Sequence, residues 1–137
     1  MLEILGGVAS AFERAGPAIV IELLNTEIYA DPMVEKVFYN LVDNAIRYGG
    51  SVTKIRFFLL VSDEGFTLVC EDDGVGIPDD QKVQIFKHGV GRNTGMGLFL
   101  SREILGITRI TILENGIYGS GARFEIQIPR GAYRFVK

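Results

Sequence analysis

The spacing of apolar residues along the chain predicts a series of helices. Three longer helices are predicted at residues 2–15, 32–48 and 97–105, with a short one at residues 79–86. The second is the clearest, because Asp31 can cap it, Pro32 suits its first position, and Gly49 and Gly50 follow its end. Gly16 ends the first helix in the same way.

Runs rich in β-branched and aromatic residues predict five strands. They lie at residues 19–24, 53–61, 66–70, 107–113 and 123–128. Phe57, Phe58 and Phe66 in these strands are expected to be core residues. The turn-forming segment 63–65 joins the second and third strands, so we expect these two to be antiparallel neighbours. A turn over residues 114–121 separates the last two. Five strands and three longer helices predict an α+β fold, a two-layer sandwich.

Composition favours one domain that acts in the cytoplasm. The chain has 137 residues, of which 47% are hydrophobic, and this is enough for one core over residues 1–137. The net charge of −3 argues against a nucleic-acid partner. The longest strongly apolar run, residues 57–61, is too short for membrane insertion, and the start of the chain lacks a secretory signal. The single cysteine, Cys70, fits a reducing compartment and a buried position.

A polar strip runs along the predicted helix 32–48, beside its apolar face. At 100° per residue, Asn44 and Arg47 lie within about 40° of Asn40. Amide oxygens suit Mg²⁺, and an arginine one turn away can bind a phosphate. Taken alone, this pattern favours the alternative to a binding site, which is a helix face exposed to solvent. The apolar stripe of the helix consists of Val34, Val37, Phe38, Leu41, Ala45 and Tyr48.

Two glycine-rich stretches carry further candidate chemistry. In the first, residues 71–78, Asp72 comes at a strand end and could accept a hydrogen bond from an exocyclic amine, while Gly74 and Gly76 allow close approach. In the second, residues 89–98, backbone N–H groups at a helix start could bind an anion together with Arg92. An acidic turn and a surface loop are the simpler alternatives for each stretch alone.

Taken together, these features resemble the ATP-binding catalytic domain of sensor histidine kinases, in the superfamily that includes DNA gyrase. The similar motifs are the N box (residues 38–48), the first glycine box (72–76), the F box (85–87), the second glycine box (95–98) and the closing GTxF strand (121–124). The resemblance covers about residues 20–130, after a leading helix at residues 1–16, and residues 93–105 are similar to archaeal sensor kinases. It implies the Bergerat fold, a mixed sheet of about five strands with three helices on one face.

The resemblance also implies a function and a set of residue roles. The domain is expected to bind Mg²⁺ and ATP and to transfer the γ-phosphoryl group to a histidine on a separate dimerisation domain, upstream of a response regulator. Asn44 is the implied Mg²⁺ ligand, and Asp72 would accept a hydrogen bond from the adenine amine. Asn40 would support the metal and the phosphates, Arg47 and Arg92 would reach the phosphates, and Tyr48 would stack on adenine. The other implied nucleotide contacts are Gly74, Gly76, Ile77, Thr94, Gly95, Met96, Gly97 and Leu98.

Three departures from the family pattern shape this expectation. Asn40 stands where hydrolytic members carry a glutamate that activates water, so efficient ATP hydrolysis is not expected. Ala122 replaces a common threonine beside adenine. His88, the only histidine, lies two residues past Phe86, just before the second glycine-rich stretch, and is a poor phosphoacceptor. The alternatives are a non-catalytic nucleotide-binding or docking module and a serine-directed kinase of the anti-sigma type.

Overall fold

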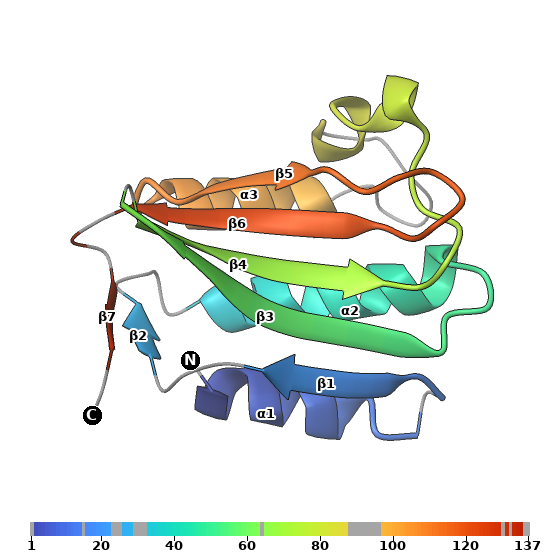
Figure 1. Ribbon diagram of the computed structural model, residues 1–137, viewed down its shortest axis with the longest axis horizontal. Coiled ribbons are helices and arrows are strands. Elements are labelled where there is room, and N and C mark those ends of the chain that lie inside the picture. The colour runs from blue at the N-terminus through green and yellow to red at the C-terminus, as the bar shows by residue number, and fades with distance from the viewer. Residues whose placement is uncertain are drawn as a thin grey trace.

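In the computed structural model, three α-helices lie behind one face of a five-stranded sheet (Figure 1). The structure describes residues 2–14, 16–22, 26–28, 33–63, 65–87, 97–129, 131 and 133–135. The helices are α1 (Leu2–Ala11), α2 (Val34–Tyr48) and α3 (Gly97–Gly106), and the strands of the sheet are β1 (Ala18–Glu22), β3 (Lys54–Ser62), β4 (Gly65–Asp72), β5 (Thr111–Glu114) and β6 (Arg123–Pro129). The predicted α+β two-layer architecture is confirmed.

The sheet is mixed, with the strand order β1-β3-β4-β6-β5. β1 runs parallel to β3, whereas β3, β4, β6 and β5 pair antiparallel in turn. The predicted hairpin is confirmed, with Phe57 opposite Cys70. A second sheet pairs β2 (Thr26–Ile28) with β7 (Tyr133–Phe135) and was not predicted. Strands of three residues from opposite ends of a chain are too short for a recognisable period.

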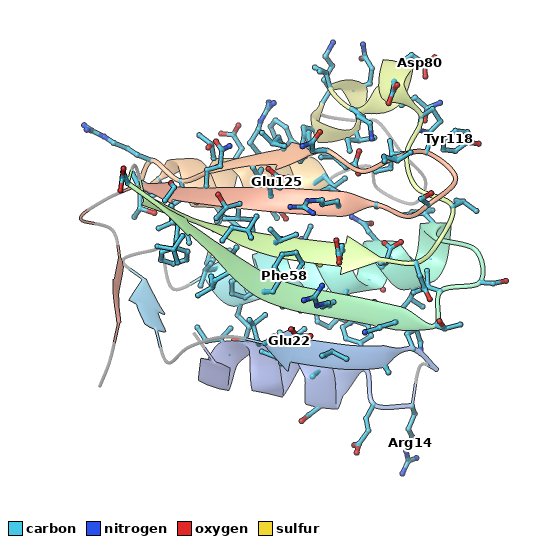
Figure 2. All side chains as sticks on the ribbon, viewed as in Figure 1. Arg14, Glu22, Phe58, Asp80, Tyr118 and Glu125 are labelled. Carbon is cyan, nitrogen blue, oxygen red and sulfur yellow. The ribbon has the colours of Figure 1, made fainter. Side chains whose placement is uncertain are left out.

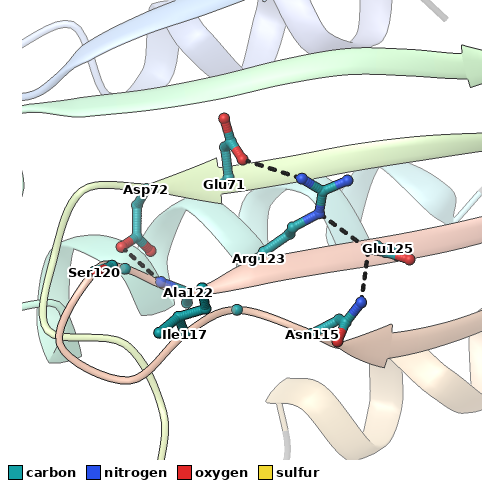
Figure 3. Close-up of a pocket in the computed structure, with 10 residues that line it drawn as sticks. Glu71, Asp72, Asn115, Ile117, Ser120, Ala122, Arg123 and Glu125 are labelled. Carbon is teal, nitrogen blue, oxygen red and sulfur yellow. Dashed lines mark hydrogen bonds and ion pairs between the residues drawn. The ribbon is translucent and has the colours of Figure 1, made fainter.

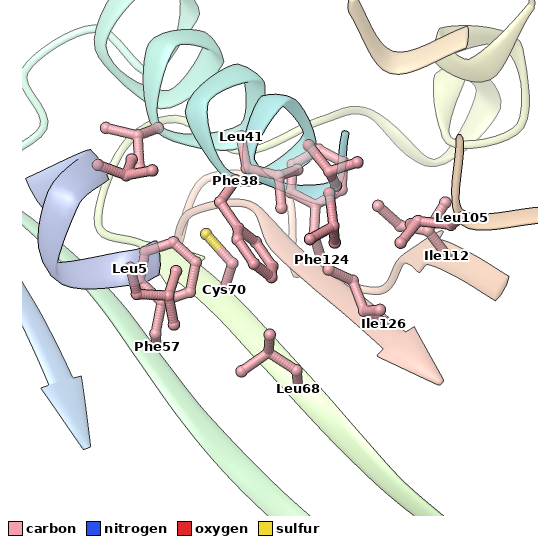
Figure 4. Close-up of a cluster of buried hydrophobic side chains, with 14 of the residues drawn as sticks. Leu5, Phe38, Leu41, Phe57, Leu68, Cys70, Leu105, Ile112, Phe124 and Ile126 are labelled. Atoms are coloured by element: carbon pink, nitrogen blue, oxygen red, sulfur yellow. The ribbon is translucent and has the colours of Figure 1, made fainter. Parts of the chain in front are cut away.

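Side chains that alternate along the strands build the core between the sheet and the helices (Figure 4). Phe57 and Phe66 are buried there, as predicted, and so is Cys70, which is 3% exposed. Burial raises the pKa of the Cys70 thiol, which fits a small apolar core residue. Phe58 was also predicted to be core, which is wrong: one step along β3, it points to the open face (Figure 2) and lies 4.3 Å from the Arg56 guanidinium.

The apolar stripe of α2 is confirmed except at its end. Val34, Val37, Phe38, Leu41 and Ala45 are buried, together with Val42. Tyr48 was predicted to belong to this stripe but is 38% exposed, because it is the last residue of the helix. The helix begins at Val34, two residues later than predicted, and the side chain of the N-cap residue Met33 makes no capping hydrogen bond. Asp31 and Pro32 lie outside the described residues.

Two other predicted elements differ from the structure. The strand predicted at 107–113 begins only at Thr111, because the chain first turns after α3 with Arg109 at φ 63° and with a hydrogen bond from Ile110 N to Leu105 O. The helix predicted at 79–86 is a pair of short 3₁₀ turns, η1 (Asp79–Gln81) and η2 (Gln84–Phe86). Such turns are common in connectors. Among the helices in the described ranges, none has both the length and the apolarity to cross a bilayer.

Candidate functional site

The polar strip of α2 faces the start of α3. The amide nitrogen of Asn40 donates to the carbonyl oxygen of Gly97 and to the hydroxyl of Ser101, each at 3.3 Å. The Ser101 hydroxyl in turn donates to Gly97 O at 2.8 Å. Asn40 and Asn44 are half-buried, so this part of the strip is not a solvated helix face. The structure therefore brings the helix of the N box against the end of the second glycine box.

Arg47 lies at the open end of the same strip and is held by its own helix. Its Nε donates to both carboxylate oxygens of Asp43, at 3.0 and 2.9 Å. This hydrogen bonding raises the pKa of the Arg47 guanidinium, whose side chain is 53% exposed. Nothing in the sequence motif singled out Asp43, although its position one turn before Arg47 is the spacing of a helical ion pair. Arg47 is thus charged and accessible at the end of α2.

The first glycine box packs against the end of α2. Val75 N donates to Gly49 O at 2.9 Å. A Cβ atom at Gly74 would lie 2.3 Å from that same Gly49 oxygen, which leaves no room for a side chain. Gly74 was predicted to allow a close approach, and in this structure the group that approaches it is the backbone at the end of the N-box helix.

Asp72 stands where β4 ends, beside the start of β6 (Figure 3). Its Oδ1 accepts hydrogen bonds from Gly74 N at 2.8 Å and Ala122 N at 3.2 Å. Burial raises the pKa of Asp72, and the two backbone hydrogen bonds oppose that effect. Within the described part of the chain no hydrogen bond reaches Oδ2. One oxygen is thus a fixed anchor, and the other can accept a donor from a ligand.

The neighbouring carboxylate, Asp73, has a different role. It accepts hydrogen bonds from the backbone N–H groups of Thr53 and Lys54, at 2.8 and 3.1 Å, and from the Thr53 hydroxyl. These bonds lower the pKa of Asp73, the Thr53 hydroxyl most of all. Asp73 therefore anchors the start of β3, whereas Asp72 is the carboxylate of the pair that links the first glycine box to the closing segment.

The closing segment approaches the first glycine box through two further glycines. A Cβ at Gly76 would lie 2.9 Å from Gly121 O, and a Cβ at Gly121 would lie 1.9 Å from Asp72 O. Both have positive φ, 78° and 115°. Ala122 keeps its link to Asp72 through the backbone, so the replacement of threonine there leaves this hydrogen bond intact. Three segments distant in sequence thus meet around Asp72.

A cavity of about 330 Å³ opens on the other side of β4 and β6 (Figure 3). No residue of α2 lines it. Its polar side chains already pair with one another: Arg123 contacts Glu71 at 3.7 Å and Glu125 at 3.0 Å, and Asn115 donates to Glu125 at 3.3 Å. It shares Asp72 and Ala122 with the candidate site.

The other predicted site residues divide into two groups. Ile77 and Leu98 are partly buried and pack against the core at the edges of the site. Arg92, Thr94, Gly95 and Met96 lie outside the described residues, as does His88. The structure thus joins the end of the N-box helix, the first glycine box and the closing strand near Asp72, and it places Asn40 against the start of α3.

The fold and the order of these motifs agree with comparisons to known proteins. The family described as "Histidine kinase-, DNA gyrase B-, and HSP90-like ATPase" matches residues 30–132. The chain belongs to this family. It is accordingly an ATP-binding catalytic domain of the kind that sensor histidine kinases carry.

Individual relatives of this ATPase domain are sensor histidine kinases. The "Sensor protein KdpD" of Escherichia coli (strain K12) is 31% identical over 113 residues, which are 77% of this chain and 13% of KdpD. The catalytic domain of histidine kinase ThkA has a TM-score of 0.78 at 26% identity, covering 94% of this chain and 93% of that one. Full-length ShkA in complex with AMPPNP shares the fold, with a TM-score of 0.80 at 18% identity, over 98% of this chain and 30% of ShkA. The chain therefore spans a small part of KdpD and of ShkA.

The donor set of this ATPase domain fits Mg²⁺ held together with phosphates. No group of three or more His, Cys, Asp or Glu that could hold a metal occurs among the residues that the structure describes. Asn44 offers a half-buried neutral amide oxygen, and Asn40 uses only its nitrogen in the hydrogen bonds described. Mg²⁺ in nucleotide sites usually keeps several waters and takes one or two protein oxygens plus substrate phosphates. A site with few protein ligands is therefore compatible with this chemistry.

Proposed function

We propose that residues 1–137 form one catalytic domain that binds Mg·ATP and donates the γ-phosphoryl group to a histidine on a separate dimerisation domain. The observation that carries this proposal is the Asp72 carboxylate. Gly74 N and Ala122 N hold one of its oxygens, and the second oxygen is available for the adenine amine. A rigid acceptor at the meeting point of three segments suits selective recognition of a base.

The phosphates would lie along the polar strip of α2. Asn44 would hold Mg²⁺, which neutralises phosphate charge when bound, and Asn40 would support the phosphates from the α3 side. Arg47 and Arg92 would bind phosphate oxygens, and Tyr48 would stack on the base. Gly76, Ile77 and Leu98 would line the nucleotide, with Thr94, Gly95, Met96 and Gly97 from the second glycine box. Phosphoryl transfer then depends on positioning and charge neutralisation more than on covalent help.

The transfer itself needs an acceptor from another protein segment. An imidazole nitrogen of the acceptor forms the new P–N bond while the bond from the γ-phosphorus to the bridging oxygen breaks, and ADP leaves with that electron pair. Asn40 cannot accept a proton from water as a general base, so water is a poor competitor for the γ-phosphoryl group. We place this reaction in the cytoplasm, upstream of a response regulator.

Two other functions would use the same fold. A non-catalytic docking module would not need an available Asp72 oxygen or a half-buried Asn44. A serine-directed kinase would share the nucleotide site and differ only in its acceptor. A docking module is tested by nucleotide binding, and a non-catalytic module that does bind nucleotide is tested by the absence of phosphoryl transfer. A serine-directed kinase is tested by the identity of the phosphorylated residue.

Calorimetric titration with ADP and AMPPNP, each with and without Mg²⁺, tests the proposal. The wild type should bind both nucleotides, and Asp72→Asn should bind them at least about tenfold more weakly. Glu71→Gln is the matched control, because Glu71 precedes Asp72 in β4 and points to the opposite face. It should bind like the wild type. No binding to the wild type would overturn the proposal and favour the docking module.

Phosphorylation of a separately produced histidine-bearing dimerisation domain tests the acceptor. Incubation with ATP should label that domain with an acid-labile phosphate. An acid-stable phosphoserine on a partner would favour the serine-directed alternative.

A further inference from the structure

Glu114, at the end of β5, carries a buried charge near the nucleotide site. Its side chain is 0% exposed. Oε2 accepts hydrogen bonds from Gly116 N at 2.9 Å and Arg123 N at 2.8 Å, and Oε1 pairs with the Lys82 ammonium group. Burial of a carboxylate is costly unless it is paired and hydrogen-bonded, and here all three donors serve that purpose.

The backbone that Glu114 holds is the wall beside Asp72. Asp72 binds Ala122 N, and Glu114 binds the next N–H group, that of Arg123. The backbones of Asn115 and Arg123 are also joined, from Asn115 N to Arg123 O at 2.8 Å. Two carboxylates from different strands thus hold consecutive N–H groups of the segment that contains Ala122. A displacement of Glu114 would be transmitted to the hydrogen bond that orients Asp72.

Lys82 connects this wall to the segment between the two glycine boxes. It follows η1 directly, and its side chain is only 17% exposed. The same segment makes a second contact with the wall, because the Phe86 ring lies edge-on to Phe124 at 6.2 Å between centroids. Segment 79–87 is therefore joined to this wall twice, by the ion pair with Glu114 at the end of β5 and by the aromatic contact with Phe124 at the start of β6.

We infer that Lys82 and Glu114 are positioning residues for nucleotide binding. This inference rests on the proposed function. The pair sets the distance between the wall that orients Asp72 and the segment from which the chain enters the second glycine-rich stretch. Neither side chain needs to contact the nucleotide. Breaking the pair should weaken nucleotide binding even in protein that remains folded.

The test combines four variants with two measurements, the melting temperature and the Kd for ADP. Lys82→Met should lower the melting temperature, since it leaves the Glu114 carboxylate buried without a cation, and should raise Kd about fivefold to tenfold. Lys82→Arg should restore both values substantially. In Lys82→Met/Glu114→Gln the uncompensated charge is gone, so the melting temperature should recover in part, while Kd stays raised. Arg56→Met is the control, because it removes ion pairs with Glu22 and Glu71 that are more exposed and lie on the open face of the sheet.

The outcomes separate a positioning role from a structural one. Arg56→Met should lower the melting temperature only slightly and leave Kd unchanged. If folded Lys82→Met and the double variant both bind ADP with the wild-type Kd, the inference is wrong and the proposed function stands. If the wild type itself does not bind ADP, the proposed function fails and this inference fails with it.

Discussion

The amide nitrogen of Asn40 on α2 donates a hydrogen bond to the carbonyl oxygen of Gly97, the first residue of α3. The Ser101 hydroxyl completes a small network by accepting from Asn40 and donating to Gly97 O. A residue at the position of the hydrolytic glutamate thus serves to join two motifs. This arrangement is consistent with a domain that transfers phosphate to a protein acceptor instead of to water.

Two variants can distinguish the structural role of Asn40, which joins α2 to α3, from its proposed contact with the phosphates. Asn40→Ala removes two hydrogen bonds between α2 and α3, and Ser101→Ala removes one of them. Each hydrogen bond lost should lower the free energy of unfolding by about 0.5–1.5 kcal/mol. Only Asn40→Ala should also weaken AMPPNP binding, by about tenfold. Urea denaturation and calorimetry measure the two effects. Equal weakening of binding in both variants would mean that Asn40 acts only through α3.

The Arg47–Asp43 pair provides a test of the phosphate role of Arg47. Arg47→Met should weaken AMPPNP binding about tenfold while stability hardly changes, because exposed helical ion pairs contribute little. Asp43→Asn should release the guanidinium and leave binding unchanged or tighter. The Kd of each variant for AMPPNP, measured by calorimetry, tests both expectations. A loss in Asp43→Asn as large as in Arg47→Met would show that Asp43 orients Arg47.

Asp72 should make nucleotide affinity depend on pH. Because burial raises its pKa above the ordinary 3.8, the folded protein holds a proton on Asp72 at pH values where the unfolded chain has lost it. The contribution of Asp72 to the free energy of unfolding therefore falls as the pH rises from 3.8 through the raised pKa. Affinity for ADP should rise over the same interval, since only the carboxylate accepts the adenine amine freely.

Asp72→Asn is the control for that pH dependence. Its ADP affinity, measured by calorimetry at several pH values, should be weaker and should lack the part of the pH dependence that comes from Asp72. A slope of affinity with pH that persists unchanged in this variant would assign the titration to another group.

A side chain at Gly121 should clash with the backbone of Asp72, and Gly119 is the control for this clash. Gly121 and Gly119 have positive φ values of 115° and 95°, but only Gly121 lies against Asp72 O, whereas nothing lies within 4 Å of a Cβ at Gly119. Gly119→Ala should therefore cost about 1–2 kcal/mol of unfolding free energy from backbone strain. Gly121→Ala should cost about 3 kcal/mol or more and should also weaken ADP binding. Equal urea midpoints for the two variants would contradict the clash.

Much of the fold follows from local patterns in the sequence. Apolar residues at helical spacing and β-rich runs predicted all three α-helices and the five strands of the main sheet, because burial on one face imposes these periods. The motifs around Asn44, Asp72 and Gly76 could be recognised by their order alone. What the local patterns could not predict are the short pairing of β2 with β7, the late start of β5 and the open-face position of Phe58.

The sequence by itself determined the elements, the family and the chemical types of the site residues, since these depend on neighbours along the chain. Only the tertiary structure decided which groups pair. Asn40 with Gly97, Asp72 with Ala122, and Lys82 with Glu114 are far apart in sequence and meet because the sheet order places β4, β6 and β5 side by side with α2 and α3 behind them. A buried charge such as Glu114 has no local signature, because its partners are chosen by packing.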